Sequence, residues 1–352
     1  MIMKKYYINV AMGTGANIAL ASVLTKIKED HPGEYWFAVM SPYFDVFECC
    51  KAVDAVYKPQ EARDFIFDAN NDEGAELVMH RPYDMDGFIK KQLNYQSAWY
   101  KLLHIEDKAP KVMNVKAAFD TTKFNLVQTA QNILADIKKK GFKSFAIMQF
   151  TGGQSPLVQV PPKTAENGQQ VPDWSKVPYN YENEPLKRHY PIEKAQEFVD
   201  KFAAEYPETA IIMYQLPNEP TPRNKNVIQM TIPYLAYVEL AKLPECEGVV
   251  AIDSSLQHLI AGICKSVVIW AHSINAETNG KIIYNNFGYE FNTNIVQPCR
   301  RDDVLFFSLL GPSGARVQYI EPDELLKIVK KTFDENVIGN YYKENGEYVL
   351  DK

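Results

Sequence analysis

An acid and two hydroxyls directly follow a buried-type strand in the second half of the chain. The apolar run at residues 248–252 ends in Asp253-Ser254-Ser255, and a helical pattern that carries His258 begins there. Ligands of open α/β sheets bind beyond the carboxyl ends of the strands, where backbone N–H groups can hold phosphate oxygens and Asp253 can accept hydrogen bonds from hydroxyls. Helix capping would explain one such residue, but three in succession, with His258 on the same face, favour a ligand site.

A basic cluster and a carboxylate stand at two other junctions between predicted elements. Lys187, Arg188 and His189 precede a predicted helix, where three potential cations oppose the helix dipole unless a di-anion such as pyrophosphate binds between them. Glu219 lies in the proline-bounded exit at 215–220, and a carboxylate there suits the two hydroxyls of a ribose. Taken singly, a solvated basic turn and an ordinary loop also explain these segments.

A glycine turn separates the first predicted strand from the first predicted helix. Gly13 and Gly15 allow a ligand to approach the backbone at the start of that helix. A dinucleotide fingerprint would need a third glycine where Ile18 stands, and an acid at the end of the second strand, where residues 39–41 offer none. Nicotinamide binding is therefore weakly supported, and a tight turn that needs small residues is an equal alternative.

Strand and helix patterns alternate along the chain in the rhythm of a parallel sheet with helical crossovers. The first part has strand patterns at 6–11, 35–40, 55–57 and 76–79, and helical patterns at 17–30, 42–50 and 124–140. The second part has strand patterns at 144–150, 210–214, 248–252 and 266–270, and helical patterns at 192–205, 232–241 and 322–333. We therefore predict an α/β fold with two similar halves and a cleft between them.

A domain boundary is predicted near residue 140. The amphipathic helix at 124–140 ends in three lysines followed by a glycine, which is a good helix stop, and a strand follows at once. The predicted domains are an N-terminal one at 1–140 and a C-terminal one at 141–320, and a final helix and tail at 321–352 are expected to pack back on the first. The stretch 151–184, rich in Pro, Gln, Gly and Asn, reads as a long loop with a functional or mobile character.

The composition excludes several classes of protein. With 46% apolar and 23% charged residues, the 352-residue chain is an ordinary globular protein with room for about two domains. Its net charge of −6 disfavours nucleic acid as the principal partner, because duplex binders usually carry a basic excess. No run of ~18 apolar residues suits a membrane span, and no signal-peptide pattern follows the first strand. Five cysteines without CxxC spacing predict reduced thiols, no zinc site and a cytoplasmic location.

Taken in chain order, these segments resemble the lipopolysaccharide heptosyltransferase family, which comprises glycosyltransferases of family 9 with the GT-B architecture. Residues 253–261 (DSSLQHLIA) resemble the family's Asp-Thr-Gly-Leu-x-His-Leu-Ala-Ala helix start and form the most specific match. Residues 188–191 (RHYP) resemble its Lys-His-Trp-Pro segment, and 217–219 (PNE) resemble the exit whose Glu contacts the ribose of the donor. The glycine-bounded first helix at 15–33 and the third strand at 53–57 (VDAVY) complete the resemblance.

The resemblance covers most of the chain in organisation and these segments in identity, and it implies two Rossmann-like domains that face each other across a cleft. It implies a nucleoside-diphosphate sugar as co-substrate in the C-terminal domain, no cofactor or metal, an acceptor in the N-terminal domain, and inverting transfer by direct displacement. Arg188, with Lys187, would neutralise the diphosphate, and Asp253 would orient the donor sugar. The resemblance further implies a donor site with Thr151, Gly152, Glu219, Ser254, Ser255 and His258, and an acceptor side with Gly13, Gly15, Asn17 and His80.

Two features depart from the family's pattern. The family's catalytic base is an Asp directly after the glycine that precedes the first helix, and Ala16 stands at that position. Because Ala16 accepts no proton, another group must act as general base, and the candidates are His80, Asp84 and Asp86 near the fourth strand and, as a weaker one, Asp45. The stretch 151–184 stands where the family has a short turn, so heptose and a lipid A core do not follow as substrates.

The first hypothesis is therefore a hexosyl- or heptosyltransferase-like enzyme that transfers a sugar to an acceptor hydroxyl on a glycan or a small molecule. Nucleic acid is the disfavoured acceptor, and a peripheral contact with a membrane stays open. The candidate catalytic residues are Arg188, Asp253, Asp84 and Asp86. Ala16 motivates the alternative of a non-catalytic nucleotide-sugar-binding protein of the same fold. The glycine turn motivates a third hypothesis, a nicotinamide-dependent Rossmann enzyme.

Overall fold

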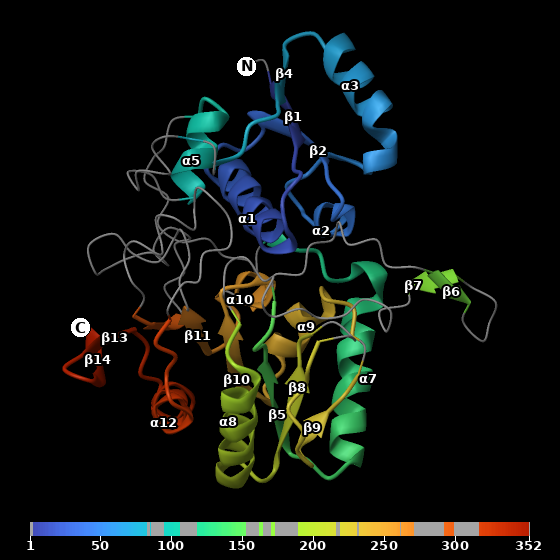
Figure 1. Cartoon of the computed structure of the whole chain (residues 1–352). Helices are drawn as coiled ribbons and strands as arrows, with labels where there is room; N and C mark the ends of the chain where they lie inside the picture. Colours follow the sequence, from blue (N-terminus) through green and yellow to red (C-terminus); the bar gives the residue numbers. More distant parts are fainter. Residues whose placement is uncertain are drawn as a thin grey trace.

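Two β-sheets, one above the other in Figure 1, form the framework of the protein. The computed structural model describes residues 3–82, 85, 95–105, 118–152, 162–164, 170–172, 189–215, 219–230, 232–260, 262–270, 292–298 and 317–351. Helices cover the faces of both sheets, and nearly all neighbouring strands are parallel. The predicted α/β fold with two similar halves is therefore confirmed.

The first sheet consists of β1 (Lys4–Asn9), β2 (Tyr35–Met40), β3 (Ala55–Tyr57) and β4 (Ala75–Val78), in the order β3-β2-β1-β4 with every pair parallel. Its central strands are aromatic and β-branched runs with mostly buried side chains, as expected of strands that are covered on both faces. The helices of this half are α1 (Thr14–Asp30), α2 (Phe44–Glu48), η1 (Pro59–Glu61), α3 (Ala62–Asn71) and α5 (Tyr95–Leu102).

The second sheet has eight strands in the order β14-β13-β12-β11-β10-β5-β8-β9. They are β5 (Ser144–Met148), β8 (Thr209–Met213), β9 (Val227–Ile228), β10 (Cys246–Ile252), β11 (Ser266–Trp270), β12 (Asn292–Val296), β13 (Asn340–Glu344) and β14 (Glu347–Asp351). Only the last pair, β13 with β14, is antiparallel within this sheet. The helices are η3 (Lys123–Asn125), α7 (Leu126–Lys139), α8 (Ile192–Glu205), α9 (Ala236–Lys242), α10 (Ser255–Ile260) and α12 (Pro322–Phe333), and β6 (Pro162–Thr164) pairs separately with β7 (Gln170–Pro172).

Both sheets have the strand order of a doubly wound fold. In the first sheet β1 lies between β2 and β4, and in the second β5 lies between β8 and β10, so the chain turns to opposite sides of the first strand of each half. The loops that leave the carboxyl ends of the strands diverge at such a switch point, which leaves a crevice in which ligands of this fold bind. The predicted ligand-binding residues after β1, β5 and β10 therefore lie at the two switch points.

The two halves share one hydrophobic core. A single cluster of buried side chains includes α1 residues such as Leu20, α9 residues such as Leu240, and α10 residues such as Leu256. Figure 1 shows α1 of the first half directly above α10 of the second. A second cluster lies under α8 and α12 on the other face of the second sheet. The interface between the halves is therefore apolar at its centre.

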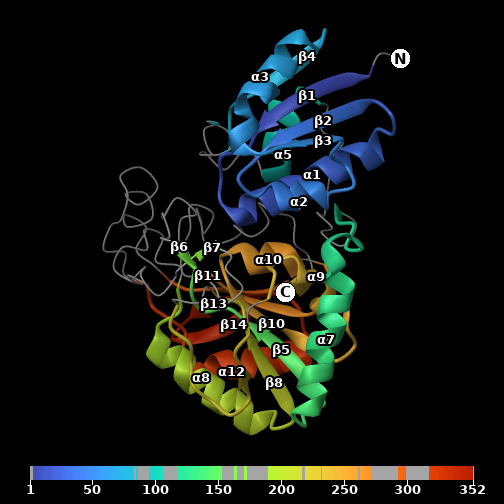
Figure 2. The ribbon, with the colours of Figure 1, turned by 90° about the vertical axis from the view of Figure 1, so that its right-hand side faces the viewer.

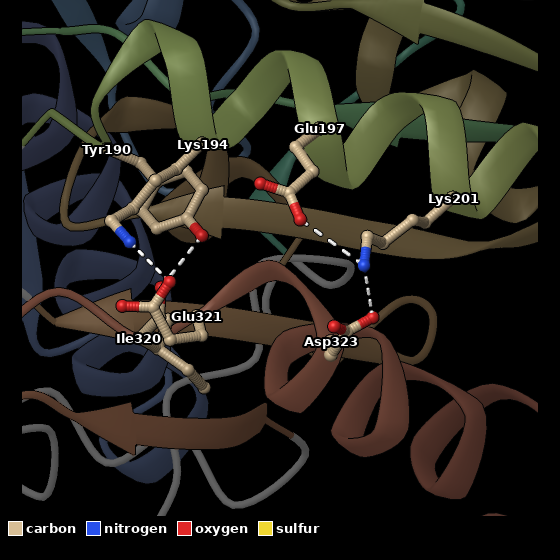
Figure 3. Close-up of polar contacts among 7 residues, drawn as sticks. All are labelled: Tyr190, Lys194, Glu197, Lys201, Ile320, Glu321 and Asp323. Atoms are coloured by element: carbon tan, nitrogen blue, oxygen red, sulfur yellow. Dashed lines mark hydrogen bonds and ion pairs between the residues drawn. The ribbon is translucent and has the colours of Figure 1, made fainter.

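The last helix packs on the second sheet, and the expectation that it returns to the N-terminal half is wrong. Figure 3 shows α12 tied to α8 by polar contacts: Nζ of Lys194 lies 2.5 Å from Glu321, and Lys201 pairs with Asp323. The hydroxyl of Tyr190 donates to the carbonyl oxygen of Ile320 at 2.8 Å. The apolar face of α12 completes the cluster under α8, and β13 and β14 extend the second sheet, so the C-terminal segment packs with the second half.

Helix α7, which the sequence places in the N-terminal domain, lies along the second half. Figure 2 shows it beside β5, and its buried residues, among them Ala130 and Ile137, belong to the core that also contains α9. The domain boundary near residue 140 stays a prediction, because one core cluster contains residues of both halves.

No helix in the described ranges combines the length and apolar character of a membrane span.

Gly248 in β10 has no room for a side chain, and this generates a test of the core. A Cβ at Gly248 would lie 2.4 Å from Cε1 of Phe333 and 2.9 Å from the carbonyl oxygen of Lys265. Because overpacking costs about 1–3 kcal/mol, we expect Gly248→Ala to lower the free energy of unfolding by that amount, measured by chemical denaturation with circular dichroism. Gly13→Ala is the control, since a Cβ at Gly13 meets nothing within 4 Å. An unchanged stability of Gly248→Ala would contradict this packing.

Candidate functional site

Polar side chains gather where β5 and β10 end, at the switch point of the second sheet. The N–H of Gln149 donates to the carbonyl oxygen of Val250 at 2.8 Å, so the chain that leaves β5 continues beside the last residues of β10. Thr151 follows β5, and Asp253 and Ser254 follow β10. The structure thus brings together residues that the sequence predicts to bind a donor but separates by about one hundred positions.

Ser254 lies at the centre of this cluster. Nε2 of Gln149 donates to Oγ of Ser254 at 3.1 Å and to the carbonyl oxygen of Thr151 at 3.0 Å. A Cβ at Gly152 would lie 2.8 Å from the same Oγ, so the main chain after β5 passes directly against the serine hydroxyl. Glycine at this position is what lets the two loops approach each other this closely.

Thr151 and Glu219 form a buried pair between the ends of β5 and β8. The hydroxyl of Thr151 donates to Oε2 of Glu219 at 3.0 Å, and the two side chains are only 2% and 7% exposed. The single hydroxyl hydrogen of Thr151 is used in this contact, so towards a ligand Thr151 can accept a hydrogen bond but has no hydrogen left to donate. Its effect is to hold the Glu219 carboxylate at the edge of the cluster.

Asp253 and Ser255 each have a partner that the sequence argument missed. Nε2 of Gln257 donates to Oδ1 of Asp253 at 3.0 Å, and both side chains are buried. The hydroxyl of Tyr214, at the end of β8, lies 2.8 Å from Oγ of Ser255. Burial raises the pKa of Tyr214 above its ordinary value, so this phenol is protonated at neutral pH. Both partners orient groups that could bind a ligand.

The turn after β1 lies against α10 of the second half. A Cβ at Gly15 would lie 2.6 Å from Cδ2 of His258, whose side chain is 5% exposed. A residue predicted on the acceptor side and a residue predicted in the donor site are therefore direct neighbours. The two switch points meet at this contact.

Asn17 uses its polar atoms to build the turn rather than to face a cleft. Its Nδ2 donates to the carbonyl oxygens of Met12 and Gly13, both at 2.9 Å, and its Oδ1 accepts a hydrogen bond from Ser41 at 2.6 Å. The side chain is fully buried. We therefore assign Asn17 a structural role in the glycine turn. This geometry does not favour the predicted contact of Asn17 with an acceptor.

The candidates for the general base are divided between described and undescribed residues. His80 is exposed just after β4. Asp84 and Asp86 lie outside the described residues, as do Lys187 and Arg188 of the basic cluster, whereas His189 is described and buried. The main chain at Ala16, where the family has its base, accepts a hydrogen bond from the hydroxyl of Tyr95 at 2.9 Å.

Asp45, the weakest of the sequence candidates, lies where the two halves meet. It belongs to α2 of the first half, and its Oδ1 accepts the N–H of Val46 at 3.1 Å. Burial and, after it, the charge of Asp45 raise the pKa of Tyr234, which belongs to the second half. The carboxylate is therefore close enough to the other half to influence a phenol there.

The sequence offered a weak signal for the residues that it missed. Gln149 is an amide at the end of an otherwise apolar strand pattern, and Gln257 stands four positions after Asp253, within reach on a helix. Tyr214 ends a buried strand and resembles a core aromatic. In the described parts of the chain, no three His, Cys, Asp or Glu side chains come together as they would around a metal ion.

No protein-family model matches the chain, and no curated protein matches it by sequence. Solved structures do share its architecture. A glycosyltransferase family 9 protein from Veillonella parvula has a TM-score of 0.58 at 10% identity, with 95% of this chain and 98% of that chain covered. The ADP-heptose lipopolysaccharide heptosyltransferase II of E. coli has a TM-score of 0.53 at 10% identity, with 95% and 99% covered. The iron-containing dodecameric glycosyltransferase TibC of enterotoxigenic E. coli has a TM-score of 0.50 at 9% identity, with 96% and 79% covered.

These likenesses establish the fold. Each extends over nearly the whole of this chain, so both halves and their arrangement are shared rather than one Rossmann-like unit. The predicted GT-B type fold and the resemblance to heptosyltransferases are therefore confirmed at the level of architecture. At 10% identity the fold carries no residue roles with it.

The contact between Gly15 and His258 predicts a measurable coupling between the halves. We expect Gly15→Ala to lower the free energy of unfolding by about 1–3 kcal/mol, because its methyl group overlaps a buried ring. In a His258→Ala background the same change should cost much less, since the overlapping ring is gone. Denaturant titrations of the two single variants and the double variant measure the difference, with Gly13→Ala as the sterically free control. Strictly additive losses would show that the two residues do not touch.

Proposed function

We propose that the protein is a glycosyltransferase that transfers a sugar from a nucleoside-diphosphate sugar to an acceptor hydroxyl. The observation that carries the proposal is the cluster at the switch point of the second sheet, where Asp253, Ser254 and Ser255 after β10 gather with Thr151 after β5 and Glu219 after β8. Hydroxyl donors suit phosphate oxygens, and carboxylates suit sugar and ribose hydroxyls. The GT-B type fold supports the proposal, because the similar solved structures include glycosyltransferases.

The donor would bind at the carboxyl edge of the second sheet. On this proposal Ser254 and Ser255 donate to the diphosphate, Glu219 accepts from the ribose hydroxyls, and Asp253 orients the sugar. Arg188, with Lys187, would stabilise the charge that develops on the leaving diphosphate, since a guanidinium binds phosphate oxygens in a bidentate manner. No metal ion is needed for these roles, and His258 would fix the loop that faces the first half.

The reaction would be a direct displacement with inversion at the anomeric carbon. The acceptor oxygen forms a new bond to the anomeric carbon. The bond between that carbon and the diphosphate oxygen breaks, and its electron pair leaves with the diphosphate. The acceptor proton must pass to a general base, which Ala16 cannot provide. Asp45, Asp84 and Asp86 are the carboxylates that we propose for comparison, with His80 as an imidazole candidate.

A second candidate function follows from Ala16. A protein that retains the donor site but lacks a proton acceptor would bind a nucleotide sugar without transferring it. On the first proposal, the acceptor would be a glycan or a small molecule. On either proposal, the protein would act in the cytoplasm, and it could reach a membrane-bound acceptor through a peripheral contact. Turnover that disappears on substitution of Asp45, Asp84 or Asp86 would exclude the binding-only function.

Donor binding is tested by the thermal stability of the intact protein. A ligand that binds only the folded state raises the free energy of unfolding as its concentration exceeds its dissociation constant, by about 2.7 kcal/mol at a hundredfold excess. We expect at least one of the UDP-, GDP-, ADP- and dTDP-sugars to raise the midpoint of thermal unfolding, and CMP-sugars, which carry a single phosphate, serve as the contrast. NAD and NADP belong in the same screen, and a shift with these alone would favour a nicotinamide enzyme.

Two substitutions test the proposed roles in transfer. Arg188→Ala and Asp253→Asn should each lower kcat/KM by about 100-fold or more, because each removes a group that stabilises the transition state. Arg223→Ala and Asp136→Asn are matched controls at exposed positions of the second half. Release of the nucleoside diphosphate, followed in a coupled assay, measures the rates. Wild-type rates in both site variants would refute the assignment.

A further inference from the structure

Each of the two serines after β10 has its hydroxyl oxygen in contact with a polar group from a neighbouring strand end. Nε2 of Gln149 lies 3.1 Å from Oγ of Ser254, and the phenol oxygen of Tyr214 lies 2.8 Å from Oγ of Ser255. Gln149 follows β5 and Tyr214 follows β8, which are the next two strands beside β10 in the sheet. The pattern is repeated on successive residues, with a different partner each time.

A third group fixes the direction of the hydrogen bond at Ser254. Nε2 of Gln149 also lies 3.0 Å from the carbonyl oxygen of Thr151. A main-chain carbonyl only accepts, so the amide nitrogen, and not the amide oxygen, must face Thr151 and Ser254. The two hydrogens of the amide are then both donated, and Oγ of Ser254 is an acceptor. The one hydroxyl hydrogen of Ser254 is left for another partner.

The acidity of the phenol favours one direction for the hydrogen bond at Ser255. A phenol loses its proton far more readily than an aliphatic hydroxyl and is accordingly the better donor. Burial keeps the pKa of Tyr214 above its ordinary value, so the hydrogen is present throughout the neutral range. Either oxygen could donate across this contact, and its acidity makes Tyr214 the favoured donor. With that direction, the hydroxyl hydrogen of Ser255 is also left for another partner.

The two serine hydrogens have no acceptor among the described residues, and their side chains are half-buried rather than enclosed. Thr151 differs in this respect, because its hydroxyl hydrogen is donated to Glu219. The cluster thus contains two hydroxyls that are prepared to donate and one that is not. Donors held in place before a ligand arrives bind an anion without reorganisation.

We propose that Gln149 and Tyr214 are positioning residues that present Ser254 and Ser255 as a pair of hydrogen-bond donors to the diphosphate of the donor substrate. This inference rests on the proposed function, and it names residues outside the predicted site. Two donors on successive residues fit two anionic oxygens of one diphosphate. The amide and the phenol act only through the serines, so their effect on binding must depend on the serine hydroxyls.

A double-mutant cycle tests this dependence on the intact protein. Isothermal titration calorimetry measures the affinity for inorganic pyrophosphate, ADP, GDP and UDP. Ser254→Ala should weaken binding by about 10-fold or more, as expected for a hydrogen bond to a charged group. Gln149→Ala should weaken it by about 5-fold in the wild type and by less than about twofold in the Ser254→Ala background. Tyr214→Phe should behave in the same way towards Ser255→Ala.

Two buried residues with other hydrogen-bond partners provide matched controls. The ring of Tyr237 packs against that of Tyr214, and the change to Phe keeps this ring contact. The hydroxyl of Tyr237 donates to the carbonyl oxygen of Met213 at 3.1 Å, and Oε1 of Gln297 accepts the N–H of Ile320 at 2.7 Å. Tyr237→Phe and Gln297→Ala remove comparable buried groups and should leave the affinity unchanged. The Gln149→Glu variant should bind the diphosphate probes more weakly than the Gln149→Ala variant. The introduced carboxylate would accept the hydrogen of Ser254 and would repel the anionic probe. The midpoint of thermal unfolding is recorded for each variant.

The outcomes separate this inference from the proposed function. If the losses from Gln149→Ala and Ser254→Ala are independent and simply add, the positioning role is wrong while the donor site stands. If the wild-type protein binds none of the four probes, both are overturned. Affinity for adenosine equal to that for ADP would overturn the assignment of the serines to a diphosphate.

Discussion

The parallel pairing of β5 with β10 is the constraint on which the candidate site depends. In this register Met148 lies opposite Val250, and the N–H of Gln149 then donates to the carbonyl oxygen of Val250. A shift by one residue would turn the side chain of Gln149 to the opposite face of the sheet and remove it from Ser254. Because both strands are buried on both faces, the apolar core fixes the register. The geometry of the polar cluster is thus set by the apolar packing of both strands.

The apolar interface between the halves limits how the site can change. Side chains of α1, α9 and α10 belong to one core cluster, and Gly15 lies against His258 in the same region. A relative movement of the halves would have to slide or separate these packed surfaces, and the absence of a Cβ at Gly15 is what lets the turn after β1 come so close. The distance between the groups after β1 and the groups after β10 is therefore set by packing. A substitution in the core of α1 would change the positions of both sets of groups.

The sequence predicted the buried strands and amphipathic helices, which depend on periodicity. It did not predict the features that depend on which elements or residues come into contact. Buried strands such as residues 248–252 were evident, because an apolar run between turn signals reports burial without naming a neighbour. The amphipathic helix at 322–333 was evident too, but its apolar face does not say which surface covers it, and its placement was wrong. The hairpin of β13 and β14 turns at Asn345-Gly346, a known turn signal, but its flanking strands are too polar to stand out. Gln149 was missed because its role depends on a residue about one hundred positions away.

The two halves contribute different chemistry to the region where they meet. In the second half, an amide and a phenol lie beside the hydroxyls of Ser254 and Ser255, and the carboxylate of Glu219 accepts the hydrogen of Thr151. In the first half, the turn after β1 uses its polar side chain, Asn17, on its own backbone, and the carbonyl oxygen of Ala16 is bonded to Tyr95. The turn therefore offers shape rather than a proton acceptor. Of the predicted proton acceptors, Asp45 of α2 and His80 after β4 are among the described residues, and Asp45 is the one whose charge influences a phenol of the second half.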